Sequence, residues 1–95
     1  MKLDLAKPYV KHFKALSVKK KKQVLKALEL FVENPRHPSL HFEVLKSAKA
    51  KKNSLHTIRI NVGDGILLLC LIHHEHYVIL DVGTHDEIYK KAERL

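Results

Sequence analysis

Two apolar stretches near the C-terminal end constrain the fold more than any other feature of this chain. GILLLCLI covers residues 65–72 and YVILDVG covers residues 77–83, and only the polar residues HHEH lie between them. Each stretch has the length and composition of a buried strand. A connection of four residues is too short for a parallel crossover. The two strands are therefore expected to form an antiparallel hairpin.

The residues before this hairpin extend the predicted sheet. Residues 55–62, LHTIRINV, alternate apolar and polar side chains as a half-buried strand does. Gly63-Asp64-Gly65 is typical of the turn that would connect this strand to the next. Residues 41–46, HFEVLK, alternate more weakly and indicate a further strand, and the basic residues 47–54 then form a loop.

Apolar side chains at spacings of three and four predict two helices before the sheet. The first is expected over Pro8–Leu16. Ser17 is suited to cap a longer second helix, because its hydroxyl can accept a hydrogen bond from the first turn. That helix should end at Asn34-Pro35, since proline disfavours helical backbone in the residue before it. The apolar residues that define this helix are Val24, Leu25, Leu28, Phe31 and Val32.

The order of these elements predicts an α+β fold. An N-terminal αα-hairpin would pack on an antiparallel four-stranded sheet, and residues 85–94 would form a short closing helix. The 95 residues contain no repeat or linker, so 1–95 is expected to be one domain. No apolar run is long enough for a membrane span, and no secretion signal is apparent. Cys70 is the only cysteine of the chain and lies within an apolar run, so no internal disulfide can form. The expected location is therefore the cytoplasm.

Charge is distributed unevenly along the chain. The net charge is +8, with 18 basic and 10 acidic residues. Residues 1–59 hold 15 of the basic and 4 of the acidic side chains, whereas residues 60–95 hold 3 and 6. A basic region on a small protein attracts polyanions, most commonly nucleic acid, although an acidic protein would respond to the same field.

Three stretches in this order resemble the RelE/ParE superfamily of toxins from toxin–antitoxin systems. They are HPSLHFEVLK at 37–46, HTIRINVGDGILLL at 56–69 and VILDVGTHDEIY at 78–89. The Gly-Thr-His ending, with an aromatic residue four positions later, is most similar to the YafQ-type branch of RelE-like ribonucleases.

The resemblance implies a type II toxin that cleaves messenger RNA, often in the ribosomal A site, without a metal or cofactor. The ribose 2′-OH would attack the adjacent phosphate and leave a 2′,3′-cyclic phosphate and a 5′-OH. A cognate antitoxin would bind and silence the toxin, which is expected to be a monomer when free. The alternatives are a ParE-like inhibitor of DNA gyrase and a catalytically degenerate, basic RNA-binding relative.

Metal-free RNA cleavage needs proton transfer at both oxygens and stabilisation of charge on the phosphate, tasks suited to histidine and arginine. The resemblance assigns the proton transfer to His85, which could otherwise be a capping or surface residue. Arg59 would face the phosphate or, alternatively, form a cross-strand ion pair. Asp64, Glu43 and Tyr89 would assist, although turn formation, a solvated strand position and simple packing explain them equally well.

Lysines of the first loop would bind RNA phosphates as point charges. These residues are Lys46, Lys49, Lys51 and Lys52. The run Lys19–Lys22 is more typical of a solvated helix face. If it has a function, contact with ribosomal RNA is the one expected.

One departure and two rival sites qualify the resemblance. Many RelE-like toxins have a Tyr-Arg pair where this chain has Gly65-Ile66, so one basic group is missing. The YafQ-type branch also lacks that arginine, but it has an aromatic residue in place of Gly65, and the departure is consistent with a weakened or inactive relative. His73, His74 and His76 surround Glu75 and could bind zinc, but a four-residue turn rarely closes a tetrahedral site. His85-Asp86 is also similar to the paired ligands of HD-type phosphohydrolases, which need a larger helical domain.

Overall fold

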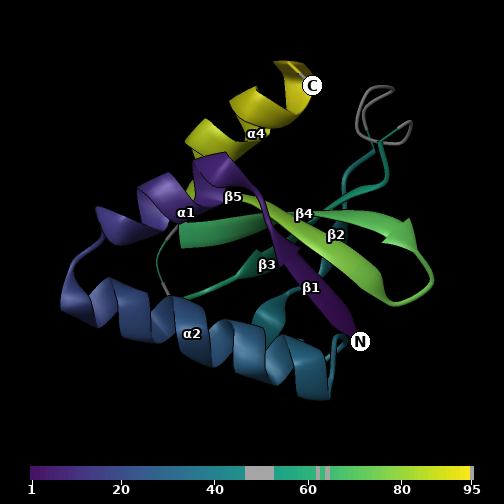
Figure 1. Cartoon of the computed structure of the whole chain (residues 1–95), viewed down its shortest axis with the longest axis horizontal. Coiled ribbons are helices and arrows are strands. Elements are labelled where there is room, and N and C mark those ends of the chain that lie inside the picture. Colours follow the sequence, from purple (N-terminus) through teal and green to yellow (C-terminus); the bar gives the residue numbers. More distant parts are fainter. Residues whose placement is uncertain (47–52, 62, 64, 95) are drawn as a thin grey trace.

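The computed structural model describes residues 1–46, 53–61, 63 and 65–94. Within these residues, three α-helices, a short 3-10 helix and five strands form the fold, and the strands make one sheet in the order β1-β5-β4-β3-β2 (Figure 1). The elements are β1 Lys2–Leu5, α1 Lys7–Lys14, α2 Val18–Glu33, η1 Pro38–Leu40, β2 Glu43–Val44, β3 Leu55–Arg59, β4 Gly65–His73, β5 His76–Thr84 and α4 His85–Arg94.

The hairpin expected from the apolar stretches is present and forms the centre of the sheet. β4 and β5 pair antiparallel from Gly65↔Thr84 to His73↔His76. Leu67, Leu68 and Leu69 have no exposed surface, which explains the unbroken apolar run. A central strand with both faces covered shows no polar alternation.

The prediction of a purely antiparallel four-stranded sheet is wrong. β1 adds a fifth strand and pairs parallel to β5, with Leu3 opposite Tyr77. Four residues are too few to show a strand period, and this pairing joins segments more than 70 positions apart in the chain. The side chain of Asp4 reinforces the pairing through a 2.6 Å contact with Nε2 of His76.

The outer strands are shorter than predicted. β2 covers only Glu43–Val44 rather than residues 41–46, because His41 before it adopts a left-handed conformation with φ 47°. β3 ends at Arg59 rather than at residue 62. Asn61 then bends the chain, with its side-chain Oδ1 accepting a hydrogen bond of 2.8 Å from the N–H of Gly63.

The helix pair forms largely as expected. α1 begins at Lys7 and ends at Lys14, two residues before the predicted end. Ser17 caps α2, since its hydroxyl accepts from the N–H of Lys20 at 3.2 Å. α2 ends at Glu33, next to Asn34-Pro35, and buries Val24, Ala27 and Phe31.

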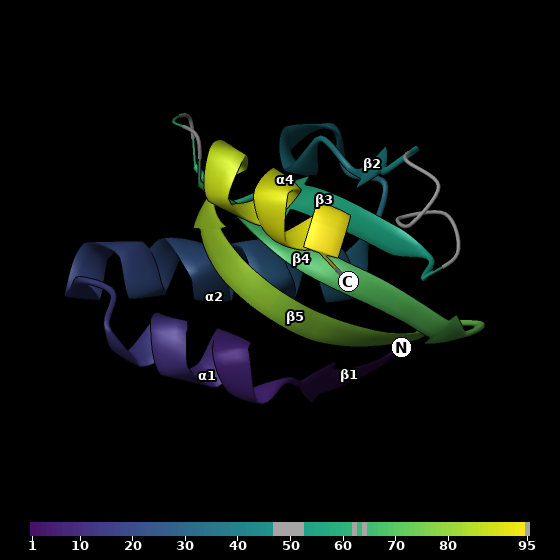
Figure 2. The ribbon, with the colours of Figure 1, turned by 90° about the horizontal axis from the view of Figure 1, so that it is seen from above.

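The helices cover both faces of the sheet, not one. α1 and α2 lie on one face and α4 on the other (Figure 2). One core lies under α2 and contains Phe31, Ile58 and Ile79. A second core lies under α4, where Leu68 packs with Ile88. α4 therefore starts at the end of the sheet where β5 ends and β4 begins, at the pair Gly65↔Thr84. No described helix is long and apolar enough to cross a membrane.

Candidate active site

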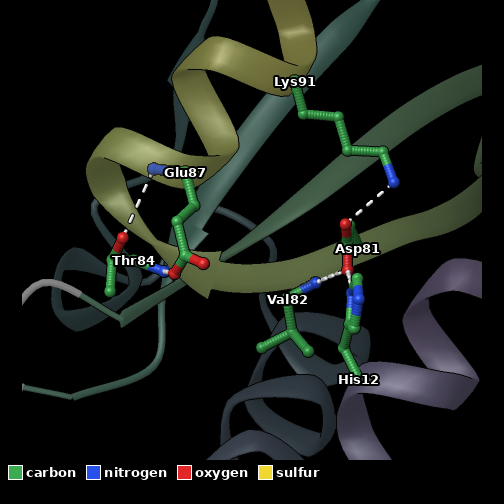
Figure 3. A network of polar contacts seen from close by, with 6 residues as sticks. All are labelled: His12, Asp81, Val82, Thr84, Glu87 and Lys91. Carbon is green, nitrogen blue, oxygen red and sulfur yellow. Dashed lines mark hydrogen bonds and ion pairs between the residues drawn. The ribbon is translucent and has the colours of Figure 1, made fainter.

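A capping box fixes the start of α4 directly after β5. The N–H of Glu87 donates to Oγ1 of Thr84 at 3.3 Å, and Oε1 of Glu87 accepts from the N–H of Thr84 at 3.0 Å (Figure 3). These reciprocal bonds satisfy two otherwise free donors. The bond from the backbone of Thr84 holds the pKa of Glu87 below its ordinary value. His85 therefore occupies the first helical position, on a rigid junction.

Three of the predicted site residues lie together on this side of the sheet. The rings of His85 and Tyr89 stack with centroids 4.0 Å apart and planes inclined by 18°. The hydroxyl of Tyr89 donates to Oε1 of Glu43 at 2.9 Å. Glu43 pairs with Thr57 across β2 and β3, so its side chain lies on the face that α4 covers. Residues from two distant segments thus form one polar chain.

Tyr89 remains protonated in this arrangement. Burial raises the pKa of its hydroxyl, and the hydrogen bond to Glu43 and the charge of that carboxylate raise it further. The phenol therefore acts as a donor that orients Glu43. The side chain of His85 is 53% exposed, and stacking on Tyr89 covers a face of the imidazole rather than its nitrogen-bearing edge. Its nitrogens remain accessible to a substrate.

Arg59 lies apart from this hydrogen-bonded chain. It pairs with Ile66, which in turn pairs with Gly83, so the three residues form one row across β3, β4 and β5. Arg59 makes no ion pair with any described residue, and the cross-strand salt bridge considered for it is absent from that part of the chain. Among the residues that the structure describes, none neutralises its guanidinium, a group that binds anions through parallel N–H donors.

The remaining predicted residues are placed only in part. Lys46 is exposed just after β2. Lys49, Lys51, Lys52 and Asp64 lie outside the described residues, so their roles stay predictions. No group of three His, Cys, Asp or Glu side chains that could hold a metal ion occurs within residues 1–46, 53–61, 63 and 65–94. Asp86 is exposed, with its carboxylate 4.0 Å from His85.

A buried carboxylate that the sequence analysis missed lies on the other side of α4. Asp81 of β5 receives bonds from Nζ of Lys91 at 2.8 Å and from the N–H of Val82 at 2.8 Å, and its Oδ1 is 2.6 Å from Nδ1 of His12 (Figure 3). Burial alone would raise the pKa of Asp81, but these hydrogen bonds outweigh burial and lower it. The only sequence signal is one acidic residue within an apolar strand.

The half-buried thiol of Cys70 resembles a structural group more than a nucleophile. Its Sγ donates to the carbonyl of Asn53 at 3.1 Å, and burial raises its pKa. A thiol with a raised pKa is a weak nucleophile.

Comparison with solved structures relates this architecture to known toxins, whereas the sequence matches no protein-family model and no curated protein. YafQ from E. coli has a TM-score of 0.69 and 15% identity, over 92% of this chain and 96% of that one. The copper-bound mutant toxin from Helicobacter pylori has a TM-score of 0.64 and 24% identity, over 93% and 98%. The RelB–RelE antitoxin–toxin complex from Methanococcus jannaschii contains a chain with a TM-score of 0.67 and 18% identity, over 93% and 96%.

This chain has the RelE/ParE toxin fold. The resemblance drawn from three sequence stretches is confirmed at the level of architecture. In this RelE/ParE-like protein, the Gly-Thr-His segment ends β5 and begins α4, beside Tyr89 and Glu43. The structure brings His85, Tyr89 and Glu43 together. Arg59 lies on β3, in the same row of the sheet as Gly83.

Proposed function

We propose that this protein is the toxin of a type II toxin–antitoxin system and a metal-free endoribonuclease that cleaves messenger RNA. The observation that carries the proposal is the chain of contacts from His85 through Tyr89 to Glu43. It combines an accessible imidazole with an oriented carboxylate on a basic protein. The toxin fold supports the same conclusion.

In the proposed mechanism, Glu43 takes the proton from the ribose 2′-OH. The 2′-oxygen then forms a bond to the adjacent phosphorus, and the bond from phosphorus to the 5′-oxygen breaks. His85 in its protonated form donates to the leaving 5′-oxygen. The products are a 2′,3′-cyclic phosphate and a 5′-OH.

Two residues support these proton transfers without exchanging protons themselves. Tyr89 orients Glu43 through its hydroxyl and His85 through ring stacking. Arg59 stabilises the additional negative charge on the phosphate, for which a guanidinium supplies two parallel donors. Asp64 would assist from the turn before β4, and Lys46, Lys49, Lys51 and Lys52 would bind flanking phosphates.

The proposed partners follow from the same fold. Structural neighbours include RelB–RelE and DinJ–YafQ complexes, which contain an antitoxin beside the toxin. We therefore expect a cognate antitoxin to bind and silence this protein, which would act on cytoplasmic messenger RNA at the ribosome. The free toxin is expected to be a monomer.

Induced expression in bacteria, followed by primer extension on an abundant messenger, tests the proposal. Wild-type protein should produce cuts that His85→Ala abolishes while the variant stays folded. His74→Ala is the matched control, since His74 is an exposed histidine in the turn between β4 and β5. Growth arrest with intact messenger would instead favour a ParE-like action on gyrase. Intact messenger with normal growth would indicate a degenerate relative.

A further inference from the structure

A cleft of about 480 Å³ lies between α2, η1 and the end of β3, away from the chain of contacts at His85. Its lining combines three kinds of group. The apolar surface comes from Leu30, Leu40 and Ile60, the amides are those of Gln23 and Asn61, and the cations are Lys26 and Arg59.

Two cations, Lys26 of α2 and Arg59 of β3, are among the residues that line the cleft. Neither Lys26 nor Arg59 forms an ion pair within the described residues. Arg59 lies at the rim of the cleft, but its strand partner Ile66 belongs to the cluster under α4, so its side chain starts on the face that carries the candidate active site. A lysine at the edge of an apolar cavity favours an anionic ligand that also has an apolar part.

The amides of this cleft are held in place by the turn beyond β3. Nδ2 of Asn61 donates to Oε1 of Gln23 at 3.3 Å, while Oδ1 of Asn61 accepts from Gly63. The NH₂ group of Gln23 makes no hydrogen bond with a described residue, which leaves it free to donate to a ligand.

Gly65 makes this arrangement sterically accessible. A Cβ at position 65 would lie 2.9 Å from Nδ2 of Asn61 and 3.1 Å from the side chain of Ile60. A side chain at position 65 would therefore crowd the amide of Asn61 and the end of the Ile60 side chain. The glycine that departs from the family pattern leaves room for the amide pair.

Arg59 connects the cleft to the candidate active site. The row Arg59, Ile66 and Gly83 crosses two strand spacings, so Arg59 and Gly83 are separated by roughly 10 Å of sheet. Gly83 is two residues before His85. This distance is more than one nucleotide step of a single strand, so a strand that spans a few nucleotides can reach both places.

We infer that this cleft binds one unpaired nucleotide of the RNA beside the cleaved phosphate. The base lies on Leu30, Leu40 and Ile60, and the free NH₂ of Gln23 donates to an acceptor on its edge. Lys26 binds its phosphate, while Arg59 at the rim contacts the cleaved phosphate. The inference rests on the proposed function for its substrate, and it assigns Gln23 as the residue that distinguishes one base from another.

Nuclear magnetic resonance with nucleotides tests the cleft directly in the wild-type protein. Adenosine, guanosine, cytidine and uridine 5′-monophosphates are titrated separately, with inorganic phosphate as the control. Gln23 is the only glutamine of the chain, so its side-chain amide signals are readily assigned. We expect these signals and the backbone signals of Leu40 and Ile60 to shift with nucleotide, by an extent that depends on the base. Equal shifts with inorganic phosphate, or shifts confined to other residues, would overturn the inference.

Binding of a short single-stranded RNA provides the second measurement, in a His85→Ala background that prevents cleavage. Lys26→Gln should reduce the slope of log affinity against log salt by about 0.7, the value for one phosphate contact of a single strand. Lys14→Gln is the matched control, since Lys14 is exposed on α1 and does not line the cleft. Equal effects of the two substitutions would contradict the assignment.

Gln23→Met keeps the shape of the side chain and removes its donor, so it should reduce the preference among bases and leave the salt slope unchanged. An unchanged preference would refute the role of Gln23. Failure of the inference is distinguishable from failure of the proposed function. Cleavage without ligand-dependent shifts in the cleft would reject only the inference, and shifts without cleavage would reject only the ribonuclease.

Discussion

At the scale of single residues, His56 is the most unusual side chain of the core. It is 8% exposed, and neither ring nitrogen has a hydrogen-bond partner within the described residues. Its ring packs against Phe42 and Tyr77, with centroids 5.0 and 5.9 Å away. Burial lowers the pKa of His56, and the positive charge of Arg36 lowers it further. The folded state therefore retains a neutral imidazole.

This environment makes stability depend on pH. The unfolded chain titrates His56 near 6.5, above the folded value, so the contribution of His56 to stability is fully present above about 6.5. It is lost as the pH falls from there through the folded pKa. We expect His56→Phe to lose less stability than wild type between pH 7.5 and 5, as measured by urea midpoints. Equal losses of stability in the two proteins would show that protonation of His56 does not destabilise the folded state.

Tyr89 permits a separate test of orientation in the candidate site. Tyr89→Phe keeps the ring that stacks on His85 and removes the hydroxyl that donates to Glu43. The cleavage rate should fall about tenfold, less than the 10² or more expected for loss of a proton-transfer group. The urea midpoint should change little, because one exposed hydrogen bond contributes only about 1 kcal/mol. An unchanged rate would remove the positioning role of Tyr89.

At the scale of elements, α4 depends on its capping box and on two buried side chains, Ile88 and Ala92. Thr84→Ala removes the hydroxyl that accepts from Glu87 and should destabilise the protein by about 1 kcal/mol in urea unfolding. Thr84→Ser retains an acceptor and should recover most of this loss. If serine were no better than alanine, the hydroxyl would not be what stabilises the start of α4.

Asp81 joins three elements, since it contacts His12 of α1 and Lys91 of α4 from its position on β5. Its pKa is lowered in the folded state, so its contribution is present above the unfolded value of 3.8 and is lost as the pH falls through the folded value. Asp81→Asn should therefore be less stable than wild type at neutral pH and lose less stability below pH 4. Urea unfolding at pH 7 and 3 measures this difference, and equal losses would contradict it.

At the scale of the whole molecule, the positive charge favours association with polyanions. The net charge is +8, with the excess of basic residues in the first 59 positions. If four RNA phosphates are contacted, the affinity of the His85→Ala variant for a single-stranded RNA should fall about 50-fold when salt rises fourfold. Fluorescence anisotropy at 50 and 200 mM salt measures this. A salt-independent affinity would argue against phosphate binding as the main attraction.

Periodicity and turn chemistry in the sequence were sufficient for most of the elements of this protein. The hairpin of β4 and β5 and the capped helix α2 follow from local patterns, namely apolar runs and a serine before a helical period. The closing helix was expected over residues 85–94, but the capping box of Thr84 and Glu87 that starts it became apparent only in the structure. The candidate residues His85, Tyr89 and Glu43 were also found from the sequence, through the family resemblance rather than through any pattern of their own.

The tertiary structure alone decided how these segments combine. β1 could be recognised only from its parallel pairing with β5, and α4 covers the second sheet face because that face of β4 is also apolar. The contacts of Asp81 with His12 and Lys91, and the cleft between Gln23 and Arg59, join side chains that are distant in sequence. Local patterns encode which face of an element is apolar, but only long-range packing selects the partner that covers it.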